Sequence, residues 1–219
     1  MKNILLFISV FTIILFLLLI LRREFFGENE DIKMWENLVK DTEYVPKVNK
    51  NKKSNILIVF EDYNCPDCKR FNNEILNSSN LLEKHNIEVR NIEMSFLGEH
   101  SLKSSVAAYA VNHFAPGKYE TFHNELLNKK TTKNSDIDVF LNRKFDTLDI
   151  QNELKIQIKK GYKNKKSEFW DNAEKDKYIS DKYNIKYSPT VYFNGKEIKN
   201  LENKVDFEKE ISPLIHKEK

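Results

Sequence analysis

Residues 56–68 read ILIVFEDYNCPDC, an apolar run followed by two cysteines. The apolar half predicts a buried strand, and Pro66, a residue favoured in the first turn of a helix, predicts that a helix begins between the cysteines. Cys65 and Cys68 are the only cysteines in the 219 residues. Cysteines three apart on a helix face the same side, so their sulfurs can form and break a disulfide without backbone movement. The stretch predicts a redox-active dithiol at the end of a strand.

The two cysteines have different predicted roles. Cys65 is expected at the helix N-terminus, where unpaired backbone N–H groups and the helix dipole favour its thiolate over its thiol. Cys65 is therefore predicted to be the exposed nucleophile. Cys68, one turn further into the helix, is predicted to be the resolving thiol that attacks a mixed disulfide formed at Cys65.

Metal binding and a purely structural disulfide explain this pair less well. A structural zinc site needs about four ligands, usually with a second C-x-x-C or a His pair. The chain has no third cysteine, and its histidines show no H-x3-H spacing. A disulfide across two residues closes too small a loop to constrain the unfolded chain much. We predict no metal site, while soft Cu(I) binding by the two thiolates stays open as an alternative. The five histidines are His85, His100, His113, His123 and His216.

The N-terminus carries a predicted membrane anchor. Residues 4–21 are apolar apart from Ser9 and Thr12, and about 18 to 20 such residues span a bilayer as a helix. A cleaved secretory signal is the alternative, but no A-x-A-like site follows the apolar run and no nearby cysteine is present to accept a lipid. We therefore favour an uncleaved anchor over residues 1–23. Lys2 and Arg22-Arg23 flank it on opposite sides, so charge does not decide its orientation.

The rest of the chain reads as one core with an elaboration. The net charge of +3, from 36 basic and 33 acidic residues, argues against a nucleic-acid-binding protein. We expect a linker with a short helix over residues 24–54, an α/β part over 55–98, a helical insertion over 99–166 and a second α/β part over 167–219. The roughly 200 residues after the anchor are enough for such a body.

Hydrophobic periodicity supports this division. Ile87 to Met94 alternates as a second strand, which with the first makes a βαβ unit. No strand candidate interrupts residues 100–166, where apolar residues recur at helical spacing. A further helix is expected over 169–183 and a last one from about Val205 to His216, shortened by Pro213. Between them Asn194-Gly195 separates two apolar runs, which is a strong hairpin signal.

Several segments together resemble the DsbA-like thiol:disulfide oxidoreductases, and the resemblance is closest to their Gram-positive branch. It covers residues 55 to about 216. The C-x-x-C alone is a moderate signal, but its order with a helical insert and a late x-Pro-Thr before a hairpin is specific. The segments that carry the resemblance are residues 62–68, Ala107-Ala108, Gly117-Lys118-Tyr119, Phe122-His123, Ser188-Pro189-Thr190 and Phe193-Asn194-Gly195.

The resemblance implies a thioredoxin fold with an inserted all-helical domain, here preceded by one N-terminal transmembrane helix. It also implies a cis Ser188–Pro189 bond whose bend lies against the cysteines and leaves the Ser188 backbone free to pair with an extended substrate. Pro66, Asp67 and Thr190 complete the expected supporting residues of the site.

Two departures from the family pattern bear on proton and charge balance. Many relatives carry a buried acid six residues before the first cysteine, where this chain has Val59. Glu61 or Asp62 is then the candidate proton relay, although both also read as solvated carboxylates at a strand end, and water or the substrate thiol are alternatives. Asp67 between the cysteines opposes the thiolate, so we expect a Cys65 pKa that is lowered less than in relatives with His there.

Three further residues have structural interpretations. His123 is expected to be a packed or surface residue and not a catalyst. Phe96 and Leu97 follow the second strand, and core packing explains them better than a substrate groove does.

The implied activity is oxidation of reduced exported proteins by the Cys65–Cys68 disulfide, through a mixed disulfide at Cys65. No cofactor beyond this disulfide is expected, and with no further cysteine an external electron acceptor must reoxidise the enzyme. The catalytic domain is expected on the extracellular side of the cell membrane, as a monomer. A reductase or isomerase of exported thiols is the main alternative, and a Cu(I)-binding thiol protein is a weaker one.

Overall fold

A five-stranded sheet organises the part of the chain that carries the cysteines. The structure is a computed structural model and describes residues 16, 30–49, 55–129 and 136–216. Residues 1–40 and 41–219 form two units, and all elements with labels below belong to the second. The strands lie in the order β1-β3-β2-β4-β5. Their bounds are Lys47–Val48 for β1, Asn55–Glu61 for β2, Ile87–Glu93 for β3, Thr190–Phe193 for β4 and Lys196–Ile198 for β5.

Strand pairing confirms the βαβ unit and the hairpin. β2 and β3 are parallel and in register from Asn55↔Ile87 to Glu61↔Glu93, so the two strands end side by side. β4 runs antiparallel to β2 and turns back into β5. β1 pairs with the outer edge of β3, whereas the sequence predicted only a linker there. Two residues are too few to show a strand period, which is why β1 was missed.

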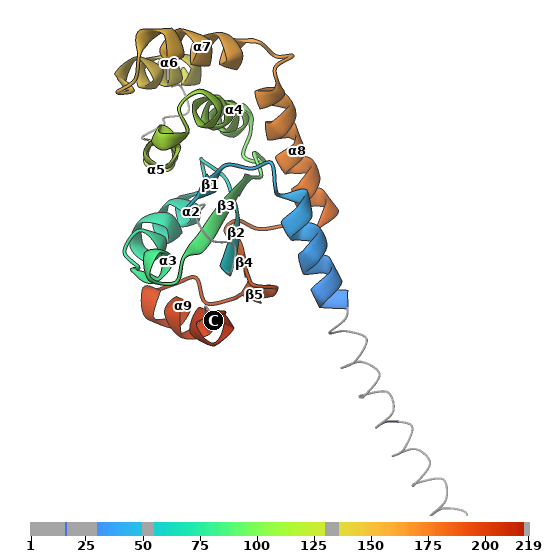
Figure 1. Cartoon of the computed structure of the whole chain (residues 1–219). Coiled ribbons are helices and arrows are strands. Elements are labelled where there is room, and N and C mark those ends of the chain that lie inside the picture. Colours follow the sequence, from blue (N-terminus) through green and yellow to red (C-terminus); the bar gives the residue numbers. More distant parts are fainter. Residues whose placement is uncertain (1–15, 17–29, 50–54, 130–135, 217–219) are drawn as a thin grey trace, which may run out of the picture. The chain divides into compact units, whose positions relative to one another are not determined.

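Helices cover both faces of this sheet (Figure 1). The helix at the cysteines is α2, Pro66–Arg70, and it continues as a π-helical turn, η1, Phe71–Leu76. Its apolar side chains pack with those of α9, Lys204–Ile211, against β2, β3 and β4. The short α3, Leu81–Lys84, lies on the same side, and α8, Glu168–Lys182, lies on the other. The chain leaves α9 through a 3₁₀ turn, η3, Ser212–Leu214, that contains Pro213.

Between β3 and α8 the described residues are helical. The elements are α4, Glu99–Phe114; η2, Pro116–Lys118; α5, Tyr119–Leu127; α6, Ile137–Thr147; and α7, Asn152–Lys163. They share an apolar core built around Phe122, Phe145 and Tyr162, and this core also contains Cys65 and Cys68. The active-site cysteines are therefore covered by the helical part. The predicted all-helical character holds for the described residues of 99–166, and the domain boundaries at residues 98 and 166 stay a prediction.

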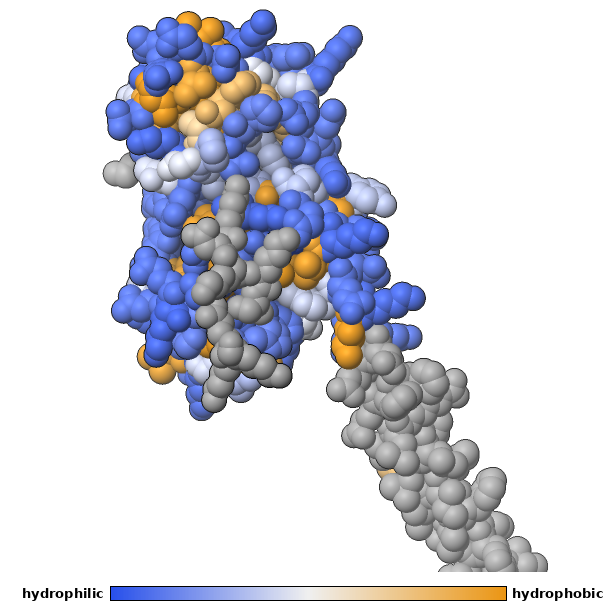
Figure 2. All heavy atoms as spheres, in the orientation of Figure 1, coloured by the Kyte–Doolittle hydropathy of each residue, from blue (hydrophilic) through white to orange (hydrophobic). Residues whose placement is uncertain are grey.

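The surface in Figure 2 is mostly hydrophilic. Apolar side chains gather over the end formed by α6 and α7, whose exposed residues include Val139 and Ile156.

The predicted anchor over residues 4–21 falls outside the described residues, except for Phe16. In the part of the chain that the structure describes, none of the helices has the length and apolar character needed to cross a membrane. Residues 30–40 of the first unit are helical, as the sequence predicted.

Candidate active site

The loop after β2 places Cys65 at the N-cap of α2. The Cys65 amide donates to the Asp62 carbonyl (2.9 Å), which fixes the approach to the helix. Pro66 is the first helical residue, as predicted. The Cys68 backbone N–H donates to Cys65 Sγ at 3.3 Å, so a free N–H of the first turn caps the sulfur. Both cysteines carry free thiols.

Cys65 is less exposed than the sequence suggested. Cys65 is only 8% exposed, and Cys68 is fully buried. The prediction of an openly exposed nucleophile is therefore corrected, because the helical part and the loop before β4 close over the site. An attacking sulfur can approach Cys65 alone.

The surroundings of the two sulfurs drive their pKa values apart. A hydrogen bond from the Cys68 thiol lowers the pKa of Cys65 to about 6, although burial opposes this shift. Further hydrogen bonds at Ser188 and from the backbone N–H groups of Cys68 and Asp67 lower it too. Burial, the bond to Cys65 and the charge of Glu61 raise the pKa of Cys68 far above its usual range. The pair therefore consists of one stabilised thiolate and one thiol that holds its proton.

The Cys65 thiolate gives the first prediction. We expect thiolate absorbance of the reduced protein to rise with a midpoint near pH 6, and Cys65→Ser to remove that step. A thiol in an unfolded chain has a pKa of about 8.5. Because the folded-state pKa is the lower one, the reduced fold should gain stability as pH rises between these values and lose it as pH falls through about 6. A midpoint near that of a free thiol would contradict the capping arrangement.

The segment before β4 faces Cys65. The Ser188–Pro189 bond is cis, as the resemblance implied. Cys65 Sγ lies 3.4 Å from the Ser188 carbonyl oxygen, to which it can donate only while protonated, so this bend contacts the nucleophile directly. Thr190 opens β4, and its hydroxyl donates to the Tyr187 carbonyl at 2.7 Å. These contacts place Ser188 beside the sulfur, and the Thr190 hydrogen bond closes the turn that contains Ser188 and Pro189.

Asp67 acts on the site mainly through its backbone. Its side chain is 70% exposed and lies 3.7 Å from Arg70 Nε, while its backbone N–H contributes to lowering the Cys65 pKa. Solvent and Arg70 therefore screen the carboxylate that was expected to oppose the thiolate.

Glu61 and Asp62 are both buried, so their interpretation as solvated carboxylates is wrong. The helical part covers this end of β2, which a strand-end position alone does not reveal. Asp62 is fully hydrogen-bonded: it accepts from the backbone N–H groups of Asn64 (2.8 Å) and Leu97 (3.1 Å) and from the Ser101 hydroxyl. Asp62 thus fixes the conformation of the loop after β2. Glu61 therefore remains the candidate acid for proton transfer.

Glu93 and His123 join Glu61, and sequence reasoning missed both. His123 Nε2 lies 3.4 Å from Glu61 Oε1, and His123 Nδ1 lies 3.6 Å from Glu93 Oε1. Burial, and next the charge of Cys65, raise the pKa of Glu61 to about 8. Burial also raises the pKa of Glu93 and lowers that of His123 to about 3. No local sequence signal marked Glu93 or His123, because the parallel register that pairs Glu61 with Glu93 is a property of the folded sheet.

Apolar side chains lie exposed beside the site. Phe96 is 52% and Leu97 is 45% exposed, so the core-packing interpretation is wrong for both. Tyr187, next to Ser188, is 80% exposed. A pocket of about 200 Å³ adjoins Phe96 and is lined also by Met94, Lys177, Ser180, Asp181, Ile185 and Lys186.

Comparisons with known proteins agree with this geometry. The family model described as thioredoxin matches residues 48–212. Disulfide bond formation protein D of Bacillus subtilis is 29% identical over 164 residues, which are 74% of this chain and 71% of that protein.

Solved structures show the same architecture. The oxidised BdbD structure from Bacillus subtilis has a TM-score of 0.66 at 25% identity and covers 81% of this chain and 94% of its own. The thiol-disulfide exchange protein α-DsbA2 from Wolbachia pipientis has a TM-score of 0.70 at 19% identity, with coverage of 84% and 94%. The latter likeness shows the fold alone.

Proposed function

Because the chain belongs to the thioredoxin family, as a DsbA-like thiol:disulfide oxidoreductase of the Gram-positive type, we propose that it donates its Cys65–Cys68 disulfide to reduced exported proteins. The observation that carries this direction is the lowered pKa of Cys65, about 6. A stabilised thiolate is a good leaving group and favours the reduced form of the enzyme, which makes the disulfide oxidising.

The reaction has two exchange steps. A substrate thiolate attacks Cys65 Sγ, the Cys65–Cys68 bond breaks, and Cys68 leaves with the electron pair and takes a proton. A second substrate thiolate then attacks the substrate sulfur of the mixed disulfide, and Cys65 leaves as a thiolate. The substrate loses two electrons and gains a disulfide, and the enzyme is left as a dithiol.

Reoxidation needs an acceptor outside this chain. Cys65 and Cys68 are its only cysteines, so no internal thiol can relay electrons. A small molecule or another protein must take the two electrons, and no further cofactor is required of this chain.

We assign substrate contact to the surface around Cys65. The backbone of Ser188, next to Cys65, can form main-chain hydrogen bonds with an extended substrate segment. The exposed side chains of Phe96, Leu97 and Tyr187 form an apolar surface that can bind the exposed apolar side chains of an unfolded substrate.

The proposed location is the cell membrane, with residues 4–21 as a single-pass anchor and the catalytic domain, a monomer, on the extracellular side. The support is the apolar sequence and the similarity to disulfide bond formation protein D of Bacillus subtilis. Labelling of Cys65 by a membrane-impermeant thiol reagent, in intact cells first treated with a membrane-impermeant reductant, tests this arrangement. Protection of Cys65 that is lost only when the cells are lysed would contradict it.

The reduction potential tests the direction of the reaction. We expect the Cys65/Cys68 couple, equilibrated with glutathione, to have a potential well above that of thioredoxin, about −270 mV. A value below about −250 mV would favour the reductase or isomerase alternative, because such a disulfide is too stable to pass on. Stoichiometric Cu(I) capture without activity on a reduced, unfolded protein would favour the copper-binding alternative.

A further inference from the structure

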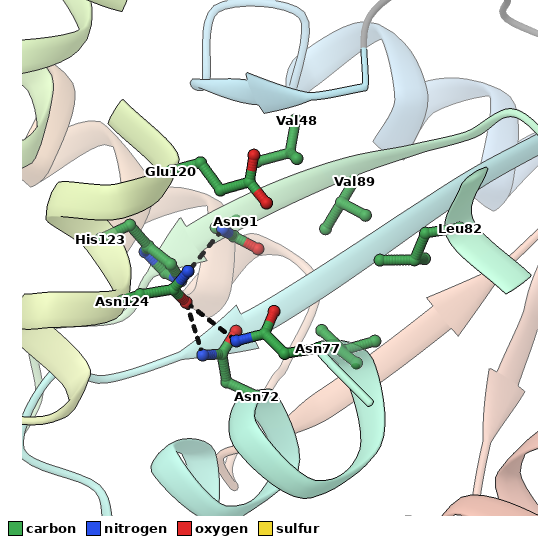
Figure 3. A pocket seen from close by; sticks show the side chains of 10 residues that line it. Val48, Asn72, Asn77, Leu82, Val89, Asn91, Glu120, His123 and Asn124 are labelled. Carbon is green, nitrogen blue, oxygen red and sulfur yellow. Dashed lines mark hydrogen bonds between the residues drawn. The ribbon is translucent and has the colours of Figure 1, made fainter. Parts of the chain in front are cut away.

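The pocket that adjoins Phe96 is large enough to hold a side chain of another polypeptide. Its volume is about 200 Å³, and an apolar cavity of about 150 Å³ is enough for a benzene molecule. The hollow beside His123 has only about 30 Å³ (Figure 3), which is enough for a water molecule. The amides of Asn72 and Asn77 donate to Asn124 there, at 2.7 and 3.3 Å. Of these two, only the pocket beside Phe96 (the Phe96 pocket) can therefore receive a substrate side chain.

One wall of the Phe96 pocket is connected to the loop that carries Cys65. Met94 and Phe96 form this wall, directly after β3. The next residue, Leu97, donates its backbone N–H to the Asp62 carboxylate at 3.1 Å. The backbone carbonyl of Asp62 accepts from the Cys65 N–H at 2.9 Å. A single residue, Asp62, therefore bridges this wall and the loop of the nucleophile.

A second wall continues into the segment that contacts the sulfur. Ile185 and Lys186 form this wall, two to three residues before Ser188. The Ser188 carbonyl oxygen lies 3.4 Å from Cys65 Sγ. Two or three residues of extended chain span roughly 7 to 10 Å. A substrate whose cysteine is bonded to Cys65 can therefore reach the pocket with a side chain two or three residues away.

The apolar part of the lining suits an aromatic ring. It consists of the thioether of Met94, the ring of Phe96 and the branched side chain of Ile185. A thioether sulfur and an aromatic edge both form favourable contacts with a second ring. Met94 and Ile185 are buried and Phe96 is half-exposed, so a ring that enters leaves water for a preformed apolar surface.

The charged part of the lining favours neither an acidic nor a basic substrate side chain. Lys177 Nζ lies 2.8 Å from Glu174 Oε2, so this lysine is already paired. Lys186 and Asp181 contribute one charge of each sign. An aromatic ring gains from a neighbouring ammonium group, because the face of the ring is negative. A tyrosine hydroxyl also finds polar groups in this lining.

We propose that the Phe96 pocket binds an aromatic side chain of the substrate, two or three residues from the cysteine that reacts with Cys65. The proposal rests on the proposed function, because it concerns the same substrates and the same exchange reaction. It adds a side-chain preference to the main-chain contact at Ser188, which any extended sequence can make. Cysteines with an aromatic neighbour at this spacing are then the preferred substrates.

Disulfide capture by the full chain carrying Cys68→Ser tests the pocket. The probes are peptides with one cysteine and one tyrosine in a Gly/Ser background, with the tyrosine moved from four residues before the cysteine to four residues after it. Each peptide thiolate displaces glutathione from Cys65 in a glutathione redox buffer, so one disulfide bond forms as another breaks. Intact mass gives the captured fraction. Because the thiol chemistry is the same for every peptide, differences in capture report contacts away from the sulfur.

We expect capture to peak with the tyrosine two or three residues from the cysteine, on one side of it. The peak should lie about tenfold above the matched alanine peptide, as for a side chain that fits an apolar pocket. Phe96→Ala and Ile185→Ala should each lower the peak toward the alanine level. Phe96 is 52% exposed, so its truncation leaves the fold intact.

Tyr178→Ala is the matched control, because Tyr178 is an exposed aromatic residue of α8 beside Lys177 but outside the pocket lining. It should keep the full peak. Leu97→Ala removes an apolar side chain beside the pocket, so it should weaken capture of all tyrosine peptides alike without moving the peak.

Equal capture at every tyrosine position would overturn the proposal, and so would a peak that persists in both pocket variants. Stronger capture of peptides with aspartate in place of tyrosine would also overturn it, in favour of charge recognition by the lysines. The proposed function is judged separately, by oxidation of a reduced, unfolded protein. If the wild type failed to oxidise that protein while the tyrosine peak persisted, the function would be refuted and the pocket assignment would stand.

Discussion

Cys65→Ser is expected to lose all thiol–disulfide exchange, whereas Cys68→Ser is expected to stop at the mixed disulfide. Attack must occur at Cys65, because Cys68 is fully buried and only Cys65 keeps some exposed surface. Once a substrate sulfur is bound to Cys65, the Cys68 thiol is the group that releases it in the reverse direction. The substrate for this test is a reduced, unfolded protein with a single cysteine, so that no second substrate thiol can release the adduct. Incubating each variant with it under mild oxidation and measuring the masses of the intact products by mass spectrometry distinguishes the two outcomes.

The double variant Cys65→Ser/Cys68→Ser is the control for this experiment. It should form no covalent adduct, and the Cys68→Ser adduct should disappear with a reducing agent. Adducts on Cys65→Ser, formed through Cys68, would show that the burial of Cys68 does not decide which sulfur reacts.

Local sequence patterns were sufficient to predict the strand and the helix that position the cysteines. The apolar run before Cys65 and the proline after it predicted a strand and a helix start, and both depend on neighbours within a few residues. Asn194-Gly195 likewise specified the β4–β5 hairpin, where both residues adopt positive φ. Such features need no knowledge of distant contacts.

The acid–base part of the site depends on distant contacts, and the sequence predicted only Glu61 of it, as a candidate proton relay. Glu61, Glu93 and His123 come from two strands and a helix of the inserted part, and they meet only after β2 and β3 pair and α5 packs over them. Each alone has an ordinary interpretation as a strand-end acid or a helix residue. Their burial, which makes them chemically unusual, is a property of the folded molecule.

A second large effect is expected at Arg90, in the middle of β3. Its side chain is fully buried, and its Nε donates to Glu88 Oε1 at 2.7 Å. Nη1 donates to Thr42 Oγ1 and Nη2 to Glu43 Oε1, each at 3.1 Å. Glu88 is itself buried. The guanidinium therefore neutralises a carboxylate that water does not reach.

Arg90→Met should lower the free energy of unfolding by about 3–5 kcal/mol, measured by urea denaturation, because it leaves Glu88 buried without its partner. Lys144→Met is the matched control: Lys144 Nζ lies 3.0 Å from Glu125 Oε2 in a partly exposed pair, and such pairs contribute about 1 kcal/mol or less. Arg90→Met combined with Glu88→Leu should recover much of the loss, since two apolar side chains then replace the ion pair. If the double variant were as unstable as Arg90→Met alone, the lost stability would come from side-chain packing and not from an uncompensated charge.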